Sequence, residues 1–143
     1  MIKSLGHVGL SVTDMERSLE FYRDFLGMKI IMDLDISDDR IAKIVGLPGA
    51  KCRIVHLTLG QAILELFHYS HPEGENFAAD MRQCDRGLIH IGFEVNNFQQ
   101  HIEELKSRGI TFLGEPLEFR PGVWVVYFRG PDGEVCEFRQ IPE

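Results

Sequence analysis

A motif that occurs twice is the feature of this sequence that most constrains its fold. Residues 7–12 read His-Val-Gly-Leu-Ser-Val, and residues 90–95 read His-Ile-Gly-Phe-Glu-Val. Each motif precedes a stretch with helical spacing that ends in a glycine, at Gly27 and at Gly109. The chain therefore contains an internal repeat, and the two copies are expected to fold alike.

The apolar periodicity predicts the elements of each copy. The strands expected in the first copy cover residues 5–12, 28–34, 52–59 and 62–69. Those expected in the second copy cover residues 88–95, 110–118, 123–129 and 134–140. A helix is expected after the cap Thr13-Asp14 in the first copy and over residues 97–108 in the second. Each copy is thus predicted to be a βαβββ module.

The predicted fold class is α+β, with two tandem βαβββ modules in a single domain over residues 1–143. Module 1 covers about residues 1–70, and module 2 covers about residues 87–143. The linker over about 71–86 is polar and includes a helical turn around residues 77–81. A polar stretch, 35–50, is predicted to be a loop with a short helix over residues 40–45.

Composition and charge limit the partners and the compartment. With 44% apolar and 26% charged residues, the chain has the composition of a soluble globular domain. The net charge of −7 argues against nucleic acid and anionic membranes as partners. Three scattered cysteines, the lack of a signal-peptide pattern and the lack of a long apolar run favour a cytoplasmic location.

Four polar side chains occupy repeated positions in the two copies. His7 and His90 open the two motifs, and Glu65 and Glu137 lie at the centres of apolar strands. Strand alternation places each of them opposite its apolar neighbours, so we expect all four on the concave side of their sheets. Two imidazoles and two carboxylates suit a first-row divalent metal, and a cation would offset the cost of a buried carboxylate.

Each of these residues alone has an ordinary structural explanation. A histidine in mid-strand is more often a core or rim residue, and a glutamate in an apolar strand is more often salt-bridged or at an edge. Their repetition in two modules is what favours a metal site. His56 lies on a strand, and alternation leaves open whether it lines the pocket, packs or faces solvent. His68, His71 and His101 are expected at the surface.

These residues resemble the vicinal oxygen chelate superfamily, which includes glyoxalase I, methylmalonyl-CoA epimerase, extradiol dioxygenases, fosfomycin-modifying enzymes and bleomycin-binding proteins. The resemblance covers essentially the whole chain. It rests on residues 6–12, 21–27, 64–66, 89–93 and on Asp132-Gly133-x-x-x-Glu137. It implies that the two modules form a cup-shaped mixed β-sheet. In this cup, one divalent ion (Zn, Ni, Co, Mn or Fe) is bound by His7, Glu65, His90 and Glu137.

Within the superfamily, the residues match glyoxalase I-like and epimerase-like members best. All four ligand positions are filled, whereas bleomycin-binding members lack the ligands. Fosfomycin-modifying and extradiol members use two histidines and one glutamate and usually have no acid at the position of Glu65. Glyoxalase I has a glutamate there, and the epimerase has a glutamine. The insertion over residues 35–50 departs from compact bacterial glyoxalase I.

The resemblance implies a metal-dependent lyase or isomerase, lactoylglutathione lyase-like or epimerase-like. Such an enzyme moves a proton on a small-molecule substrate with vicinal oxygens, through a metal-bound enediolate or enolate. Glu137 is the expected catalytic base, with Glu65 as the alternative. Two other functions stay open, an extradiol-type dioxygenase using iron and a metal-free ligand-binding or resistance protein. A homodimer is expected, with the cup completed within one chain or between two.

Overall fold

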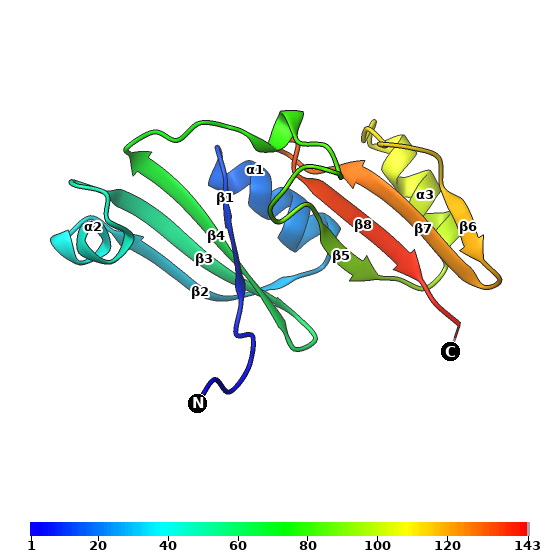
Figure 1. The fold of residues 1–143 in the computed structure, drawn as a ribbon, viewed down its shortest axis with the longest axis horizontal. Helices are drawn as coiled ribbons and strands as arrows, with labels where there is room; N and C mark the ends of the chain where they lie inside the picture. The colour runs from blue at the N-terminus through cyan, green and yellow to red at the C-terminus, as the bar shows by residue number, and fades with distance from the viewer. Residues whose placement is uncertain (143) are drawn as a thin grey trace. The chain divides into compact units, whose positions relative to one another are not determined.

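Two four-stranded sheets make up the chain, one in each of two units (Figure 1). This computed structural model describes residues 1–142. Unit 1 covers Met1–Asn76 and unit 2 covers Phe77–Glu143, so the boundary lies inside the stretch predicted as a linker. Both sheets are mixed, and the predicted α+β class with two βαβββ modules is confirmed. That the two modules form a single domain stays a prediction.

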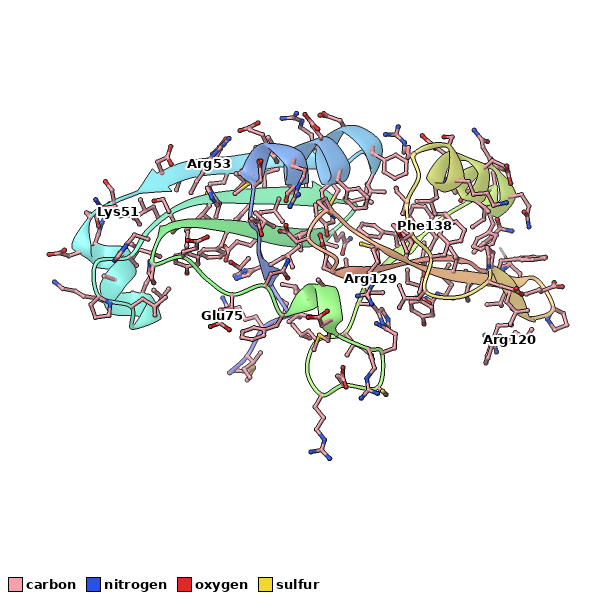
Figure 2. The ribbon with its side chains drawn as sticks, turned by 90° about the horizontal axis from the view of Figure 1, so that it is seen from above. Lys51, Arg53, Glu75, Arg120, Arg129 and Phe138 are labelled. Atoms are coloured by element: carbon pink, nitrogen blue, oxygen red, sulfur yellow. The ribbon has the colours of Figure 1, made fainter. Side chains whose placement is uncertain are left out.

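Unit 1 follows the predicted order, and the short helix predicted over residues 40–45 is present as α2. Its elements are β1 (Val8–Ser11), α1 (Met15–Leu19), η1 (Glu20–Phe25), β2 (Lys29–Ile36), α2 (Asp39–Val45), β3 (Lys51–Leu59) and β4 (Ala62–His71). The strand order is β1-β4-β3-β2, with β1 parallel to β4 and the other neighbours antiparallel. α1 and η1 lie over one face of the sheet (Figure 2). Leu19, Val55 and Leu66 are fully or almost fully buried.

The first helix begins and ends where the sequence predicts. The Asp14 carboxylate accepts a hydrogen bond from the backbone N–H of Arg17 at 3.1 Å, which caps the helix. After Leu19 the helix widens to a π-helix, and Tyr22 in this turn is completely buried. Gly27 then adopts a left-handed conformation with φ of 76°, which suits glycine and ends the helix.

Unit 2 repeats this arrangement. Its elements are η2 (Ala78–Asp80), β5 (Ile91–Glu94), α3 (Phe98–Ser107), β6 (Leu117–Arg120), β7 (Val123–Arg129) and β8 (Val135–Gln140). The strand order is β5-β8-β7-β6, with β5 parallel to β8. Phe138 lies among the side chains between α3 and the sheet (Figure 2), where its ring contacts those of Phe128 and His101. The expectation that His101 faces solvent is therefore wrong, because this ring packs on the core.

Arg129 ties the segment before β5 to the end of β7 (Figure 2). Its guanidinium donates hydrogen bonds to the carbonyl oxygens of Gly133 at 2.8 Å, Ala78 at 3.2 Å and Met81 at 3.3 Å. A planar guanidinium presents several donors at fixed angles, so one side chain can satisfy three carbonyls. The helical turn predicted around residues 77–81 is present as η2 and is anchored in this way.

The strand predicted over residues 110–118 is wrong in its extent. Phe112 forms only an isolated bridge to Phe128, and the strand β6 begins at Leu117. Gly114 and Pro116 interrupt the stretch. Proline has no N–H to donate to a ladder, and glycine gains no side-chain packing in a strand, so pairing stops and resumes after them.

The first strand of each module is shorter than predicted. The ladder between β1 and β4 starts at Val8, and the ladder between β5 and β8 starts at Ile91. Each of these strands lies at the edge of its sheet and has one neighbour, so it extends only as far as that neighbour pairs with it. His7 and His90 consequently lie immediately before their strands. Within residues 1–142, no helix has the length and apolar character needed to cross a bilayer.

Arg53 joins three elements of unit 1 on its surface (Figure 2). Its guanidinium donates two hydrogen bonds to the Asp33 carboxylate on β2, at 2.9 and 2.8 Å, and one to Glu16 on α1 at 2.5 Å. The hydrogen bonds from Arg53 hold the pKa of Asp33 below its usual value. Arg53 therefore has a structural role, linking β3 to β2 and to the first helix.

Replacing Arg53 with methionine is expected to lower the free energy of unfolding by about 1 kcal/mol at pH 7, because the pair is partly exposed. The depressed pKa of folded Asp33 means that its stabilisation is complete above its unfolded pKa, about 3.9, and is lost as pH falls through the folded pKa. The difference between parent and Arg53→Met should shrink below about pH 4. Urea denaturation at several pH values measures this, with Arg120→Met as the control.

Candidate metal and catalytic site

Unit 1 brings His7 and Glu65 together on one face of its sheet. β1 and β4 are parallel, and Gly9 stands opposite Glu65 in their ladder. His7 precedes Gly9 by two residues, so alternation directs the His7 side chain to the face that carries Glu65. His7 Nε2 lies 3.6 Å from Glu65 Oε1. The Glu65 side chain is only 14% exposed, while that of His7 is 51% exposed.

Unit 2 brings His90 and Glu137 together in the same way. β5 and β8 are parallel, and Gly92 stands opposite Glu137. His90 Nε2 lies 3.6 Å from Glu137 Oε2, and the Glu137 side chain is again 14% exposed. The backbone therefore presents one imidazole and one carboxylate at matching positions in each unit. The repeat seen in the sequence is a repeat of side-chain geometry.

The spacing within each pair fits a shared cation better than a direct hydrogen bond. At 3.6 Å the nitrogen and oxygen are beyond hydrogen-bond distance. Two ligands that each lie about 2.1 Å from one ion at a tetrahedral angle are about 3.4 Å apart. Each pair therefore has the donor types and nearly the separation that two neighbouring ligands of zinc or a similar ion require.

The tautomer of His90 is set by Gln83. The amide nitrogen of Gln83 donates to the carbonyl oxygen of Ile89 at 2.9 Å, which turns its amide oxygen toward His90. His90 Nδ1 lies 2.9 Å from that oxygen, and an amide oxygen can only accept, so Nδ1 carries the hydrogen. Nε2 of a neutral His90 then carries no hydrogen, faces Glu137 and has a lone pair available for a metal ion. This is the arrangement of a metal-binding histidine with a supporting partner.

His56 is part of the site in unit 1, and the sequence did not place it there. It stands directly opposite Glu65 in the ladder of β3 and β4. Its Nε2 is hydrogen-bonded to Glu65 Oε2, and its ring centre lies 5.8 Å from that of His7. The sequence left open whether His56 lines the pocket, packs or faces solvent. The structure places it on the face that carries His7 and Glu65.

Tyr127 holds the matching position in unit 2. It stands opposite Glu137 in the ladder of β7 and β8, and its ring meets His90 edge-on at 5.2 Å. Burial raises the pKa of the Tyr127 phenol, and the charge of Glu137 and a hydrogen bond to it raise it further. The phenol is therefore neutral near pH 7 and lies against both members of the pair.

The four predicted ligands are found as two pairs, one in each unit. Within the described residues, 1–142, no three or more His, Cys, Asp or Glu side chains are grouped as a metal site. Convergence of His7, Glu65, His90 and Glu137 on a single ion stays a prediction. What the structure shows is that each unit supplies a nitrogen and an oxygen with the spacing of neighbouring ligands.

Comparison with known proteins identifies relatives with related activities. The chain is 32% identical over 144 residues to lactoylglutathione lyase of Pseudomonas aeruginosa, covering 94% of this chain and 81% of that protein. It is 27% identical over 111 residues to mitochondrial methylmalonyl-CoA epimerase of Mus musculus, covering 78% of this chain and 56% of that protein. This chain therefore spans only about half the length of the mouse epimerase.

Solved structures share the fold. A glyoxalase family protein from Bacillus cereus superposes with a TM-score of 0.90 over 98% of this chain and 95% of its own, at 15% sequence identity. At this identity the likeness concerns the fold alone. A family model, described as the glyoxalase/bleomycin resistance protein/dioxygenase superfamily, matches residues 4–138, nearly the whole chain. The chain belongs to this superfamily.

Proposed function

We propose that the chain is a divalent-metal-dependent lyase or isomerase of the glyoxalase I type, acting on a small molecule with vicinal oxygens. The metal ligands in this proposal are His7, Glu65, His90 and Glu137. The observation that carries it is the same 3.6 Å separation between imidazole nitrogen and carboxylate oxygen in both units. The relatives named lactoylglutathione lyase and methylmalonyl-CoA epimerase support this reaction class.

The chemistry divides between the ion and the side chains. A bound divalent ion would act as a Lewis acid that makes the C–H bond beside a substrate oxygen more acidic. His90 presents Nε2 because Gln83 holds the hydrogen on Nδ1. Glu137 then takes the proton on a carboxylate oxygen. It returns the proton to the neighbouring carbon of a 2-oxoaldehyde adduct, or to the same carbon of an acyl-CoA ester.

The names of the relatives define the substrates to test. We propose that the substrate is either the adduct of a 2-oxoaldehyde with a thiol or an acyl-CoA ester with a hydrogen-bearing carbon beside the carbonyl. Both contain an acidic C–H next to a carbonyl, so one proton-transfer site serves either. The two classes differ in the thiol carrier, which the four-residue site does not distinguish.

Solvent-deuterium exchange tests the proposed function. The protein is loaded in turn with zinc, nickel, cobalt or manganese and incubated in D₂O with each substrate class. We expect deuterium to enter the carbon beside the carbonyl in the loaded protein and not in the chelator-treated protein. If iron-loaded protein instead consumes oxygen on a catechol and no metal supports exchange, the proposal is wrong and the dioxygenase reading replaces it.

Glycine at position 92 is expected to be required for proton transfer. A Cβ atom added at Gly92 would lie 3.0 Å from Glu137 Oε2, whereas one added at Gly9 would have no atom within 4 Å. Gly92→Ala should therefore displace the flexible end of Glu137 without preventing folding. Misplacing a catalytic group by about 1 Å costs up to about 10²-fold in rate. Measured exchange should fall in Gly92→Ala and remain near the parent value in Gly9→Ala.

We further propose that the protein acts as a homodimer. Large apolar side chains are exposed on two edge strands, with Ile31 and Leu34 on β2 and Leu117 and Phe119 on β6. Exposed apolar edges favour association. Sedimentation at micromolar concentration should give twice the mass of one chain. Finding a monomer across this range would contradict the dimer without affecting the proposed reaction.

A further inference from the structure

The two units carry a third residue at equivalent positions, and its identity differs. In unit 1, β3 places His56 opposite Glu65, and in unit 2, β7 places Tyr127 opposite Glu137. The histidine and glutamate of each unit already match one another in register and in spacing. The third position is therefore where the two half-sites diverge in chemistry.

In unit 1 the two carboxylate oxygens have separate partners. Glu65 Oε2 is bound by His56 Nε2, while Oε1 faces His7 Nε2 at 3.6 Å. An ionised carboxylate can only accept hydrogen bonds, so the hydrogen of the first contact belongs to His56. Both side chains are largely buried, His56 being 21% and Glu65 14% exposed. With Oε2 held by this bond, Glu65 keeps Oε1 in the direction of His7.

In unit 2 the third residue also lies against both the imidazole and the carboxylate, but it is a tyrosine. The Tyr127 ring packs edge-on against His90 at 5.2 Å. His90 has its own support from Gln83 on Nδ1. His56 and Tyr127 thus each lie against the histidine and the glutamate of their own unit. They differ in the group that meets the carboxylate, which is a ring nitrogen in His56 and a phenol in Tyr127.

We propose that His56 is a positioning residue that holds Glu65 as a fixed metal ligand and so leaves proton transfer to Glu137. This inference rests on the proposed function, its first half on the proposed metal ligands and its second half on the proposed reaction. Partners that hydrogen-bond to metal ligands typically contribute about 10- to 100-fold to metal affinity. His56 contributes through Glu65, and it neither binds the ion nor carries the transferred proton.

Two substitutions separate positioning from packing. His56→Phe keeps an aromatic ring of similar size and removes the donor. His56→Gln restores an N–H donor of similar reach. Zinc affinity is measured by competition with a chromophoric chelator, and the unfolding temperature of the apo protein is measured beside it. We expect about 10- to 100-fold weaker zinc binding in His56→Phe, recovery toward the parent in His56→Gln, and similar apo unfolding temperatures in both. Tyr127→Phe is the matched control in unit 2.

The rate at saturating zinc completes the test. Once saturated, His56→Phe should exchange deuterium within a few-fold of the parent rate, because Glu137 is intact. Parent-like zinc affinity in His56→Phe, or equal loss in His56→Gln, would overturn the positioning role. A lowered rate at saturation would place His56 in the proton path and also overturn it. If the parent binds zinc with the expected dependence on His56 yet exchanges no substrate, the positioning role stands and the proposed reaction fails.

Discussion

Replacing Glu137 with glutamine is expected to abolish most proton exchange while the protein keeps its fold and much of its metal affinity. The amide oxygen of glutamine can still face the ion, but the amide cannot accept the proton. Removing a general base typically costs about 10²- to 10⁴-fold in rate, and the loss here should be at least of this order. Metal content by mass spectrometry, measured beside deuterium exchange, separates the two properties.

The control for this experiment is the matching residue of the other unit. Glu65→Gln changes a carboxylate of equal exposure, 14%, at the equivalent register position. We expect it to weaken metal binding more than Glu137→Gln does and to retain measurable exchange when loaded. If Glu137→Gln exchanges at the parent rate while Glu65→Gln does not, the roles of the two glutamates are reversed.

Replacing His7 with alanine is expected to remove metal and activity together. His7 is a proposed ligand, so its loss should lower metal affinity by more than the roughly 100-fold that marks the upper range for a supporting partner. Added metal in excess should restore little exchange. This separates His7→Ala from Glu137→Gln, in which metal is retained and the rate is lost.

His68 provides the control for this loss. It lies on β4 three residues after Glu65, so alternation directs its side chain to the opposite face of the sheet. His68→Ala should keep both metal and activity. Equal loss in His68→Ala and His7→Ala would indicate that general destabilisation, rather than removal of a ligand, caused the effect. Parent-like metal content in His7→Ala would remove His7 from the ligand set.

The repeat made most of the fold predictable. Two copies of one motif, each followed by a helix and by a strand with a central glutamate, predict two modules with equivalent positions, and the structure has them. The ends of the first strands were overestimated because alternation cannot show where a neighbouring strand stops pairing. The prediction of one strand over residues 110–118 was wrong because Pro116 has no N–H to donate to the neighbouring strand. This proline is visible in the sequence and could have been used to shorten the predicted strand.

His56 shows which part of the site needed more than alternation. Alternation along one strand does not show which face of the sheet a given side chain lies on. The register of a hairpin does, because it pairs that residue with one whose face is known. Leu59 pairs with Ala62 across the two-residue turn Gly60-Gln61, and counting back from this pair sets His56 opposite Glu65. The two-residue turn therefore predicts that His56 lies opposite Glu65.

The contact between Gln83 and His90 could not be predicted from strand patterns. Gln83 lies in the irregular segment of unit 2 between η2 and β5, and it reaches His90 through a loop conformation that no periodic pattern encodes. The two pairs of proposed ligands were found from the sequence because they lie at repeated positions beside regular strands. The residue that sets the tautomer of His90 has no counterpart in such a pattern.

The central claim is that His7, Glu65, His90 and Glu137 bind one divalent ion. A crystal structure of the zinc-loaded protein, with the ion located by its anomalous scattering, tests it most directly. We predict one ion for each set of four residues, whether the set lies within one chain or between two. His7 Nε2, His90 Nε2 and one oxygen of each glutamate should lie about 2.0–2.3 Å from it. An ion bound by other residues, or His7 and His90 bound to different ions, would contradict the account.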